Sequence, residues 1–286
     1  MNTVLINIVD GIATVTLNRP DARNALNPEL AAAFPAAITR CDNDDNVHAI
    51  ILTGADPAFC AGFDLRELST RERGSEPNPP PPYRAAIPPH RKPVIGAING
   101  AAVTGGFEIA LACDFLIASD RARFADTHAR VGLLPGWGLT VMLPEAIGIR
   151  RAKQLSLSGA FLDAETALEW GLVNEVVPHQ HLLHRAHEIA ALIAANPAHS
   201  VQAVMALYDE VAELAPPEAW TLENERARRW IVNRFDKANL AERREGIVET
   251  GRRLASAEPP TEPASEPVSE PVSEPDGPYS ASDQDQ

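Results

Sequence analysis

The sequence predicts an α/β protein whose last third is mostly helix, and three observations lead to this fold class. Short apolar runs rich in β-branched residues end at glycine, as in "HAIILTG" (48–54) and "KPVIGAING" (92–100), which is typical of buried strands. From about Ala164 onward the apolar residues recur with the helical period, and amphipathic stretches continue to about Leu254. A chain of 286 residues also supplies enough apolar material for a large core.

The other predicted elements can be justified in chain order. "VLINIVDGIATVTLN" (4–18) is two β-rich runs joined by Asp10-Gly11, a strong signal for a hairpin. "NPELAAAFPAAITRCDNDD" (27–45) has helical character, and we expect Pro35 to kink or interrupt that helix. A further strand is expected in "DFLIASDRARF" (114–124), followed after Ala164 by the helices "DAETALEWG" (163–171) and "HLLHRAHEIAALIAAN" (181–196).

Two segments differ in composition from the rest of the chain. Residues 76–93 hold eight prolines, so they cannot form a regular helix and are expected to form a surface loop or polyproline stretch. Residues 257–286 repeat Glu-Pro-x-Ser with a period of four and contain eight acids and no basic residue. Such a segment is too polar and too rich in proline to bury a core, and we predict that this tail is disordered.

Composition excludes several classes of protein. The net charge is −14, more than half of it in the tail, which argues against a nucleic-acid binder. Three cysteines without metal-type spacing predict neither a disulfide framework nor a zinc site, and they suit a reducing compartment. A group of histidines lies on a helical stretch, namely His179, His181, His184, His187 and His199. His184 and His187 share a helix face, but without an acid or cysteine alongside we expect the group to form a solvated face rather than a metal site. No secretory signal or membrane span is recognisable, so we predict a soluble cytoplasmic protein.

Two glycine-bearing turns are the strongest indication of chemistry. In "AFCAGFDLREL" (58–68) and "INGAAVTGGFEIALACD" (98–114), a strand is followed by small residues and then by a predicted helix start. Glycine lets the backbone approach a ligand closely, and a helix start presents free N–H groups. Two such turns could direct two N–H groups at one carbonyl oxygen, which is the arrangement of an oxyanion hole. Neither turn has the spacing of a dinucleotide fingerprint or a P-loop.

Five motifs in a fixed order extend this interpretation to a family. They are "LNRPDARNAL", "AFCAGFDLREL", "KPVIGAINGAAVTGGFEIALACDFLIASDRARF", "GLLPGWGL" and "WGLVNEVVP". Together they resemble the enoyl-CoA hydratase/isomerase (crotonase) superfamily from about residue 3 to residue 250. The resemblance implies a crotonase-like spiral of ββα units over residues 1–195 and a C-terminal helical trimerisation region over 196–256. It also implies an acyl-CoA substrate, no cofactor other than the coenzyme A of that substrate, and a homotrimer or a hexamer formed from two trimers.

The resemblance also assigns roles to individual residues. It places the two oxyanion N–H groups on Phe63 and Gly105, and Glu108 on the first of two glutamates that hydratases use to hold water. The second glutamate is expected twenty residues further on, where this chain has His128. The substrate-binding positions are Ala61, Gly62, Phe63, Asp64, Leu65, Arg66, Gly105 and Trp137. Trp137 replaces a small residue of the family, and it either narrows the acyl pocket or packs at the surface.

His128 is the most informative departure from the family pattern. Its imidazole has an ordinary pKa of about 6.5, so it can accept or donate a proton near neutral pH. If residues 124–128 are extended, the two-residue period puts Asp126 and His128 on one side, where they form a pair, or Asp126 itself serves as the acid. A third interpretation is that His128 caps a loop and the site has one acid or is inactive.

Three functions follow from these alternatives. The first is a lyase that hydrates a 2-enoyl-CoA in fatty-acid or related metabolism, with Glu108 activating water and His128 or Asp126 as its proton partner. The second keeps the enolate chemistry in a double-bond isomerase, a decarboxylase or a C–C hydrolase. The third is a non-catalytic acyl-CoA-binding protein, against which a carboxylate in an apolar run argues. The sequence does not specify the acyl chain.

Overall fold

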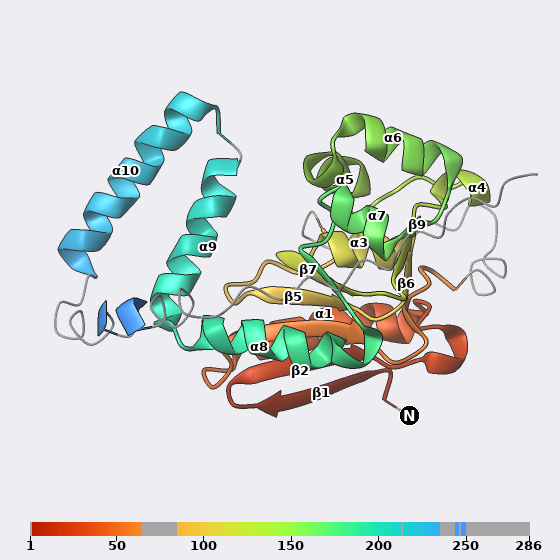
Figure 1. The fold of residues 1–286 in the computed structure, drawn as a ribbon, viewed down its shortest axis with the longest axis horizontal. Coiled ribbons are helices and arrows are strands. Elements are labelled where there is room, and N and C mark those ends of the chain that lie inside the picture. The colour runs from red at the N-terminus through yellow and green to blue at the C-terminus, as the bar shows by residue number, and fades with distance from the viewer. Residues whose placement is uncertain (1, 65–84, 213, 235–243, 246, 250–286) are drawn as a thin grey trace, which may run out of the picture. The chain divides into compact units, whose positions relative to one another are not determined.

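The computed structural model describes residues 2–64, 85–212, 214–234, 244–245 and 247–249 (Figure 1). The chain divides into two units, Met1–Arg226 and Ala227–Gln286, and both sheets and the candidate site belong to the first. The expectations for Leu65, Arg66, residues 76–84 and the tail 257–286 lie outside the described residues.

A six-stranded sheet with the order β1-β2-β3-β5-β7-β10 forms the larger layer of the first unit. Its strands are Val4–Val9, Ile12–Leu17, Ala49–Gly54, Val94–Ile98, Phe115–Ser119 and Glu175–Val177. The Asp10-Gly11 turn closes an antiparallel hairpin of β1 and β2, as predicted, and the remaining neighbours are parallel. Every residue of β3 and of β5 is buried, because helices cover both faces of a parallel sheet.

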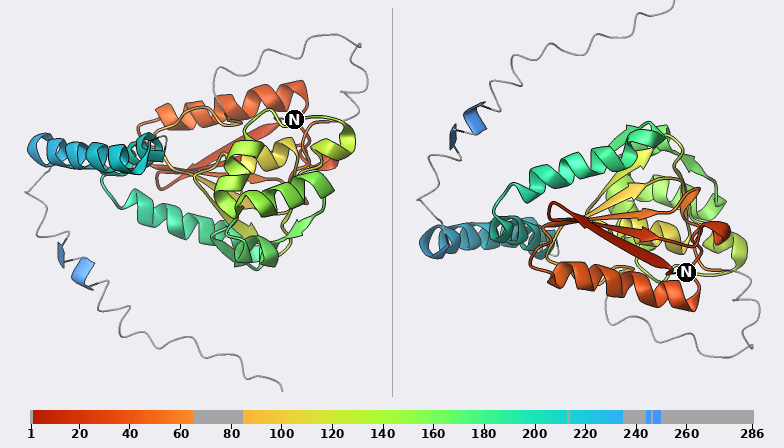
Figure 2. Two further views of the ribbon diagram at one scale, coloured as in Figure 1. Left: turned by 90° about the horizontal axis from the view of Figure 1, so that it is seen from above. Right: turned by 90° about the horizontal axis from the view of Figure 1, so that it is seen from below.

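Helices α1 (Pro28–Asn43) and α8 (Leu182–Ala194) lie on opposite faces of this sheet, as both views of Figure 2 show. Side chains of β3 alternate between the two layers. Ile50 and Leu52 belong to the core on the α1 side, and Ile51 packs with the apolar residues of α8. The uninterrupted apolar run of β3 therefore fills two cores.

A second sheet of four short strands lies beside the first, with the order β4-β6-β8-β9. The strands are Ala58–Cys60, Ala101–Val103, Arg123–Ala125 and Leu162–Asp163. The chain passes from the large sheet to the small one three times, from β3 to β4, from β5 to β6 and from β7 to β8. The latter two passages lead into helices α3 (Gly105–Leu111) and α4 (His128–Val131). This repetition is the expected succession of ββα units.

The remaining helices are α5 (Leu139–Ile147), α6 (Ile149–Ser158), α7 (Ala164–Glu169), α9 (Ala198–Ala212) and α10 (Pro216–Asn233). Helices α5 and α6 were not predicted, and the helical part of the chain begins well before Ala164. Within the described residues, no single helix is long and apolar enough to cross a membrane, and one pair, His179–Ala194 with Ala198–Ala212, qualifies only when joined across a 103° bend.

Three sequence-based expectations for the fold were wrong. Helix α1 continues through Pro35 without interruption; its neighbours Phe34 and Ile38 are fully buried, and their packing offsets the one lost backbone hydrogen bond. The segment 114–124 forms two strands in different sheets, because the chain turns at residues 120–122. The described end of the proline-rich segment is not all surface loop, since Ala86 and Ile87 are buried in the core.

Candidate active site

The two glycine-bearing turns are in direct contact. Gly62 has a φ of +85°, and a Cβ atom there would lie 2.7 Å from the carbonyl oxygen of Val103 and 3.4 Å from the nitrogen of Gly105. A Cβ atom on Gly106 would lie 2.1 Å from the carbonyl oxygen of Cys60. Any larger side chain at these positions would push the turns apart. The glycines therefore bring the start of α3 against the end of β4.

Both of the N–H groups assigned to the oxyanion hole lie at this junction. Leu26 forms a parallel bridge to the turn at Gly62: its N–H donates to the Gly62 carbonyl (2.7 Å), and its own carbonyl accepts from the Asp64 N–H (3.1 Å). In such a bridge the residue in between, Phe63, directs its N–H away from Leu26. Gly105 is the first residue of α3, so its N–H has no acceptor within the helix.

Glu108 lies one turn further along α3, and its side chain is only 1% exposed. The N–H groups of Gly136 and Trp137 donate to its Oε1 over 3.2 and 2.7 Å. These donors directly precede α5, whose positive N-terminal end favours a carboxylate. Burial nevertheless raises the pKa of Glu108 above its ordinary value, because the backbone donors and His128 compensate only part of the desolvation. Glu108 is therefore a buried carboxyl group and not a water-facing residue of a helix start.

Asp126, His128 and Glu108 form a continuous buried chain. Asp126 Oδ1 lies 2.6 Å from His128 Nδ1, and His128 Nε2 lies 3.8 Å from Glu108 Oε2. The predicted pair of Asp126 and His128 exists, but the extended backbone expected for it does not. β8 ends at Ala125 and His128 begins α4, so the pair forms through a local loop in which Asp126 Oδ1 also accepts from the His128 N–H over 3.1 Å.

The state of Asp126 determines how His128 is used. Burial acts to raise the pKa of Asp126, but hydrogen bonds from the His128 ring, the Ser156 hydroxyl and the His128 N–H outweigh it, so that pKa lies below its ordinary value. An ionised Asp126 only accepts, so His128 Nδ1 must carry the donated hydrogen. The other nitrogen, Nε2, then faces Glu108. Ser156 lies on the unpredicted helix α6, and no sequence signal indicated it.

Trp137 connects the turn at Gly62 to Glu108. Its ring packs against that of Phe63 with centroids 4.9 Å apart and planes tilted by 52°, while its N–H holds Glu108. The half-buried ring thus lies at the site and is packed against its neighbour rather than isolated on the surface. Asp64 forms an ion pair with Arg19 over 3.4 Å, and Arg19 was not among the predicted residues.

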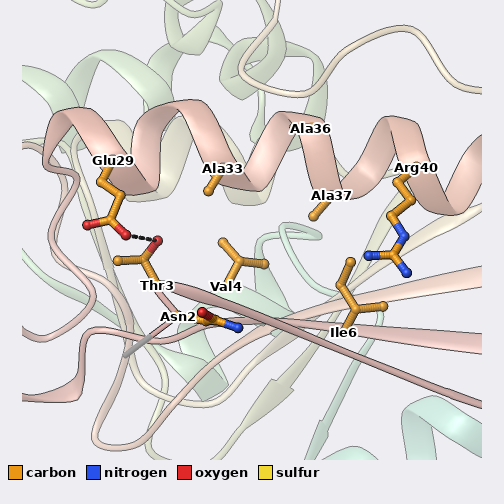
Figure 3. Close-up of a pocket in the computed structure, with 9 residues that line it drawn as sticks. All are labelled: Asn2, Thr3, Val4, Ile6, Glu29, Ala33, Ala36, Ala37 and Arg40. Atoms are coloured by element: carbon orange, nitrogen blue, oxygen red, sulfur yellow. Dashed lines mark hydrogen bonds between the residues drawn. The ribbon is translucent and has the colours of Figure 1, made fainter.

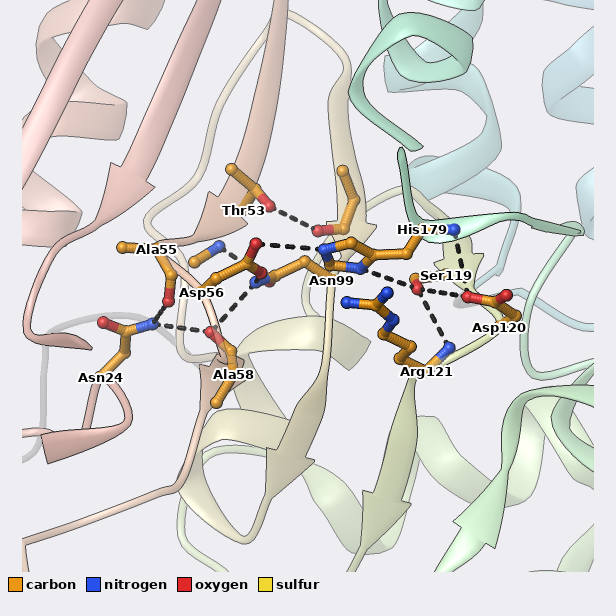
Figure 4. A network of polar contacts seen from close by, with 12 residues as sticks. Asn24, Thr53, Ala55, Asp56, Ala58, Asn99, Ser119, Asp120, Arg121 and His179 are labelled. Carbon is orange, nitrogen blue, oxygen red and sulfur yellow. Dashed lines mark hydrogen bonds and ion pairs between the residues drawn. The ribbon is translucent and has the colours of Figure 1, made fainter. Parts of the chain in front are cut away.

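A polar network at the carboxyl ends of strands of the large sheet supports the turn at Gly62 (Figure 4). The side-chain amide of Asn24 donates to the carbonyls of Ala55 and Ala58, both over 2.7 Å. The Asn99 amide donates to Asp56 Oδ1 over 2.9 Å and to Ala58. Asp56 Oδ2 in turn lies 3.1 Å from His179 Nε2. These contacts hold the chain between β3 and β4, from which the turn at Gly62 continues.

The histidines of residues 179–199 do not form the uniformly solvated face that was expected. His179 belongs to the network just described, and His187 Nε2 lies 3.0 Å from Thr14 Oγ1. His184 does have an acid alongside, because Glu188 Oε1 lies 3.1 Å from its Nε2. The described residues contain no group of three or more His, Cys, Asp or Glu side chains able to hold a metal ion.

The site places two turns that can stabilise an anion, at Gly62 and Gly105, near a pair of groups that can transfer a proton, Glu108 and His128. Two N–H groups at joined turns can stabilise an oxygen that gains negative charge. Glu108 Oε2 and His128 Nε2, 3.8 Å apart, can both reach one water molecule at hydrogen-bond lengths of about 2.8 Å. The site is therefore equipped to add or move a proton next to a carbonyl group.

Comparison with known proteins gives one consistent family. Residues 7–249 match the family described as enoyl-CoA hydratase/isomerase. The chain is 37% identical over 248 residues to a probable peroxisomal enoyl-CoA hydratase 1 of Arabidopsis thaliana, covering 87% of this chain and 93% of that protein. It is 36% identical over 207 residues to a 1,2-epoxyphenylacetyl-CoA isomerase of Escherichia coli, covering 69% and 78%. An enoyl-CoA hydratase structure from Mycobacterium tuberculosis H37Rv aligns at 51% identity with a TM-score of 0.67, covering 74% of this chain and 89% of that one.

Proposed function

Because the chain belongs to the enoyl-CoA hydratase/isomerase family, we propose that it adds water across the double bond of a 2-enoyl-CoA. The observation that carries this proposal is the buried contact of Glu108 with His128, one helical turn from Gly105. A carboxyl and an imidazole at this distance can divide the two proton transfers of hydration between them.

The first part of the mechanism is the polarisation of the thioester. The N–H groups of Phe63 and Gly105 donate to the thioester carbonyl oxygen, which gains negative charge when a nucleophile attacks C3. Preorganised donors stabilise the resulting enolate more than the substrate, and this difference lowers the barrier. Coenzyme A is part of the substrate, and the proposed steps use no group other than the chain's own residues and water.

The second part is the transfer of protons. Glu108 takes a proton from water as the water oxygen bonds to C3. C2 of the enolate then takes a proton from Nε2 of protonated His128, and the proton held by Glu108 returns to His128 across the 3.8 Å gap. Asp126 holds the ring and stabilises its charged form. The sum of these steps is one water molecule added, with both catalytic groups regenerated.

Incubation with crotonyl-CoA tests this proposal. We expect loss of the enoyl-thioester absorbance and formation of 3-hydroxybutyryl-CoA, identified by mass spectrometry. The Glu108→Gln variant, which keeps an oxygen for the Gly136 and Trp137 donors, should bind acyl-CoA and not hydrate it. Tight acyl-CoA binding by the unmodified chain, without turnover of crotonyl-CoA or longer 2-enoyl-CoA thioesters, would contradict the hydratase proposal and support a binding protein.

Double-bond isomerisation is the second candidate, because Glu108 and His128 face each other directly and could pass one proton between two carbons. The family description names isomerases beside hydratases, which supports this candidate at the level of the reaction class. Incubation with 3-enoyl-CoA distinguishes the two. An isomerase yields 2-enoyl-CoA as its end product, whereas a hydratase leaves 3-enoyl-CoA unchanged.

A further inference from the structure

The loop that leads from α4 to α5, residues 132–138, has no regular secondary structure, and two glycines in it flank Trp137. Gly138 has a φ of +100°, and a Cβ atom on Gly136 would meet no other atom within 4 Å. Glycine leaves the backbone free to take several paths, so neither residue fixes the loop. Leu134 is 89% exposed, whereas Trp137 packs against the main core. The indole is therefore a contact that ties this part of the loop to the core.

The indole of Trp137 packs on the ring of Phe63, the residue whose N–H is assigned to the oxyanion hole. The two ring centroids lie 4.9 Å apart, with the planes tilted by 52°. Tilted contacts at such distances are a preferred geometry of aromatic pairs, so the two rings hold each other in place. The Phe63 ring also covers Gly105, where a Cβ atom would lie 3.2 Å from its Cε2 atom. One ring thus contacts both Trp137 and the residue that supplies the second N–H group.

The backbone N–H of Trp137 binds the carboxyl group of Glu108. It donates to Glu108 Oε1 over 2.7 Å, and the N–H of Gly136 donates to the same oxygen over 3.2 Å. The other oxygen, Oε2, lies 3.8 Å from His128 Nε2. Because a carboxyl group is planar, fixing Oε1 limits where Oε2 can lie. The position of Trp137 therefore affects where the oxygen that faces the imidazole is held.

We propose that Trp137 is a positioning residue that couples the two oxyanion-stabilising turns to the acid Glu108. This inference rests on the proposed function, because it gives Trp137 a part in the steps of hydration. The indole sets the loop against Phe63, and the N–H of the same residue sets the carboxyl group of Glu108. The donors to the thioester oxygen and the group that takes the proton of water are then held at one separation. A displacement of about 1 Å between such groups can lower a rate by about a hundredfold.

The other role open to the indole is that of a wall of the acyl pocket, and steady-state kinetics distinguishes the two. A wall affects acyl chains according to their length, whereas a positioning residue changes the rate for every acyl chain by the same factor. We expect Trp137→Ala to lower kcat by about tenfold to a hundredfold on both crotonyl-CoA and 2-octenoyl-CoA, with KM nearly unchanged. Trp137→Phe keeps an aromatic ring against Phe63 and should restore kcat to within a few-fold. Losses that differ between the two substrates would refute positioning.

Infrared titration of the Glu108 carboxyl group gives a second readout, which needs no turnover. The band of the protonated carboxyl is assigned by its absence in Glu108→Gln. Burial raises the pKa of Glu108, and the Trp137 N–H is the largest of the contacts that lower it again. The titratable groups that face Glu108, His128 and behind it Asp126, stay unchanged in the variants. Trp137→Ala should therefore move the midpoint to higher pH, and Trp137→Phe should leave it in place.

The opposite results overturn the inference. A midpoint that moves to lower pH in Trp137→Ala would show that the indole only shields Glu108 from water. An unchanged midpoint would show that the indole does not hold the N–H against the carboxyl group. If Trp137→Ala does not fold by circular dichroism, Trp137→Leu takes its place in both measurements, because leucine keeps apolar bulk without the ring.

Two control variants separate positioning from a general loss of packing. Trp170→Ala also removes a half-buried indole that packs against the main core. Ile6→Ala removes a partly buried side chain of β1 that faces the cavity between β1 and α1 (Figure 3). Neither should shift the Glu108 band or lower kcat, and a shift in either as large as that of Trp137→Ala would refute the inference. Acyl-CoA binding without hydration would contradict the proposed function instead, and the infrared titration would still decide whether Trp137 positions Glu108.

Discussion

Two carboxylate–imidazole pairs in this chain have similar geometry and different surroundings. Asp126 Oδ1 lies 2.6 Å from His128 Nδ1, and Asp56 Oδ2 lies 3.1 Å from His179 Nε2. The pKa of each aspartate is lowered by its hydrogen bonds against the effect of burial. The side chains of the first pair are 2% and 5% exposed, and those of the second are 63% and 16% exposed.

The two pairs differ in the group that faces the second ring nitrogen of the imidazole. His128 faces Glu108, a carboxyl group whose pKa burial raises and which lies one helical turn after Gly105 on α3. His179 faces Ser119, whose hydroxyl accepts from the Arg121 N–H and donates to Asp120. An Asp-His-Ser sequence of contacts resembles a nucleophilic triad on distances alone. Here these contacts form a structural network, because the Ser119 hydroxyl is fully buried and already hydrogen-bonded to Asp120 and to the Arg121 N–H.

The comparison teaches that a proton-transfer site needs more than a polarised imidazole. The reactive group must have a nitrogen or oxygen atom that no other protein group occupies by a hydrogen bond. Preorganised donors must also stabilise the charge that develops during the reaction. Of the two pairs compared, the one that joins Asp126, His128 and Glu108 meets both conditions.

Replacing Glu108 by Gln should have the largest effect. Hydration should fall by about 10²–10⁴-fold, because the variant cannot accept the proton of water. The variant should also be more stable at neutral pH. A raised pKa means that the stability associated with Glu108 is complete below the ordinary pKa of about 4.3 and is lost as pH rises through the folded-state value.

Crotonyl-CoA turnover and thermal melts at pH 5 and pH 8 measure these two effects. The exposed Glu145→Gln on α5 is the matched control and should change neither. Near-normal turnover in Glu108→Gln would show that water is activated elsewhere.

Variants of His128 and Asp126 should cause the next largest losses of hydration activity. His128→Ala should lower hydration by about a hundredfold or more, because C2 loses its proton donor. Asp126→Asn should cost between about tenfold and a hundredfold, because asparagine no longer stabilises the charged ring. If Asp126 itself were the acid, the order of the two losses would be reversed. A split between kcat and KM separates the roles, since Asp126→Asn should lower kcat and leave KM nearly unchanged.

The second pair should matter for stability and little for catalysis. His179→Ala removes hydrogen bonds to Asp56 and Ser119 and should lower the free energy of unfolding by about 1 kcal/mol. Urea denaturation measures this loss, with His184→Ala on the exposed face of α8 as the control. Hydration by His179→Ala should stay within a few-fold of the unmodified chain. A hundredfold loss would mean that this network takes part in the chemistry.

Acid stability gives the smallest and most specific contrast. Because its pKa is lowered, the stabilising effect of Asp126 is complete above the ordinary pKa of about 3.9 and is lost as pH falls through the folded-state value. Asp126→Asn should therefore flatten the decline of melting temperature between about pH 4 and pH 2. An unchanged slope in that range would show that Asp126 is not held as a carboxylate by His128.

Much of the fold and part of the candidate site could be predicted from local patterns. The hairpin at Asp10-Gly11, the buried runs of β3 and β5, and the helix after Gly105 all have signals within a few residues. The pair of Asp126 and His128 was also predictable, because the two residues belong to one short loop. The geometry expected for this pair, an extended backbone over residues 124–128, was wrong. The strand ends at Ala125, and the loop after it brings the two side chains together.

Other features had no local signal, or one that the prediction missed. Helix α5 is apolar over most of its length and shows little contrast between its faces. Helix α6 is different: its buried residues Ala152 and Leu155 recur at helical spacing, a signal that was not used in the prediction. Ser156 and Arg19 reach the site from segments far away in sequence. The assignment of His179 to a solvated face was wrong, because its partners Asp56 and Ser119 follow other strands of the sheet.

Glycine turns, hydrophobic periods and motif spacing are local properties, and they predict the α/β class, the family resemblance and the residue types at the site. Tertiary structure decided how those residues act. The contact of Gly62 with Gly105, the amide donors to Glu108 and the gap between Glu108 and His128 join segments separated by up to forty-three residues. Only packing sets such distances, and only burial raises the pKa of Glu108. The chemistry of this chain therefore depends on where its strands end and which helix starts they bring together.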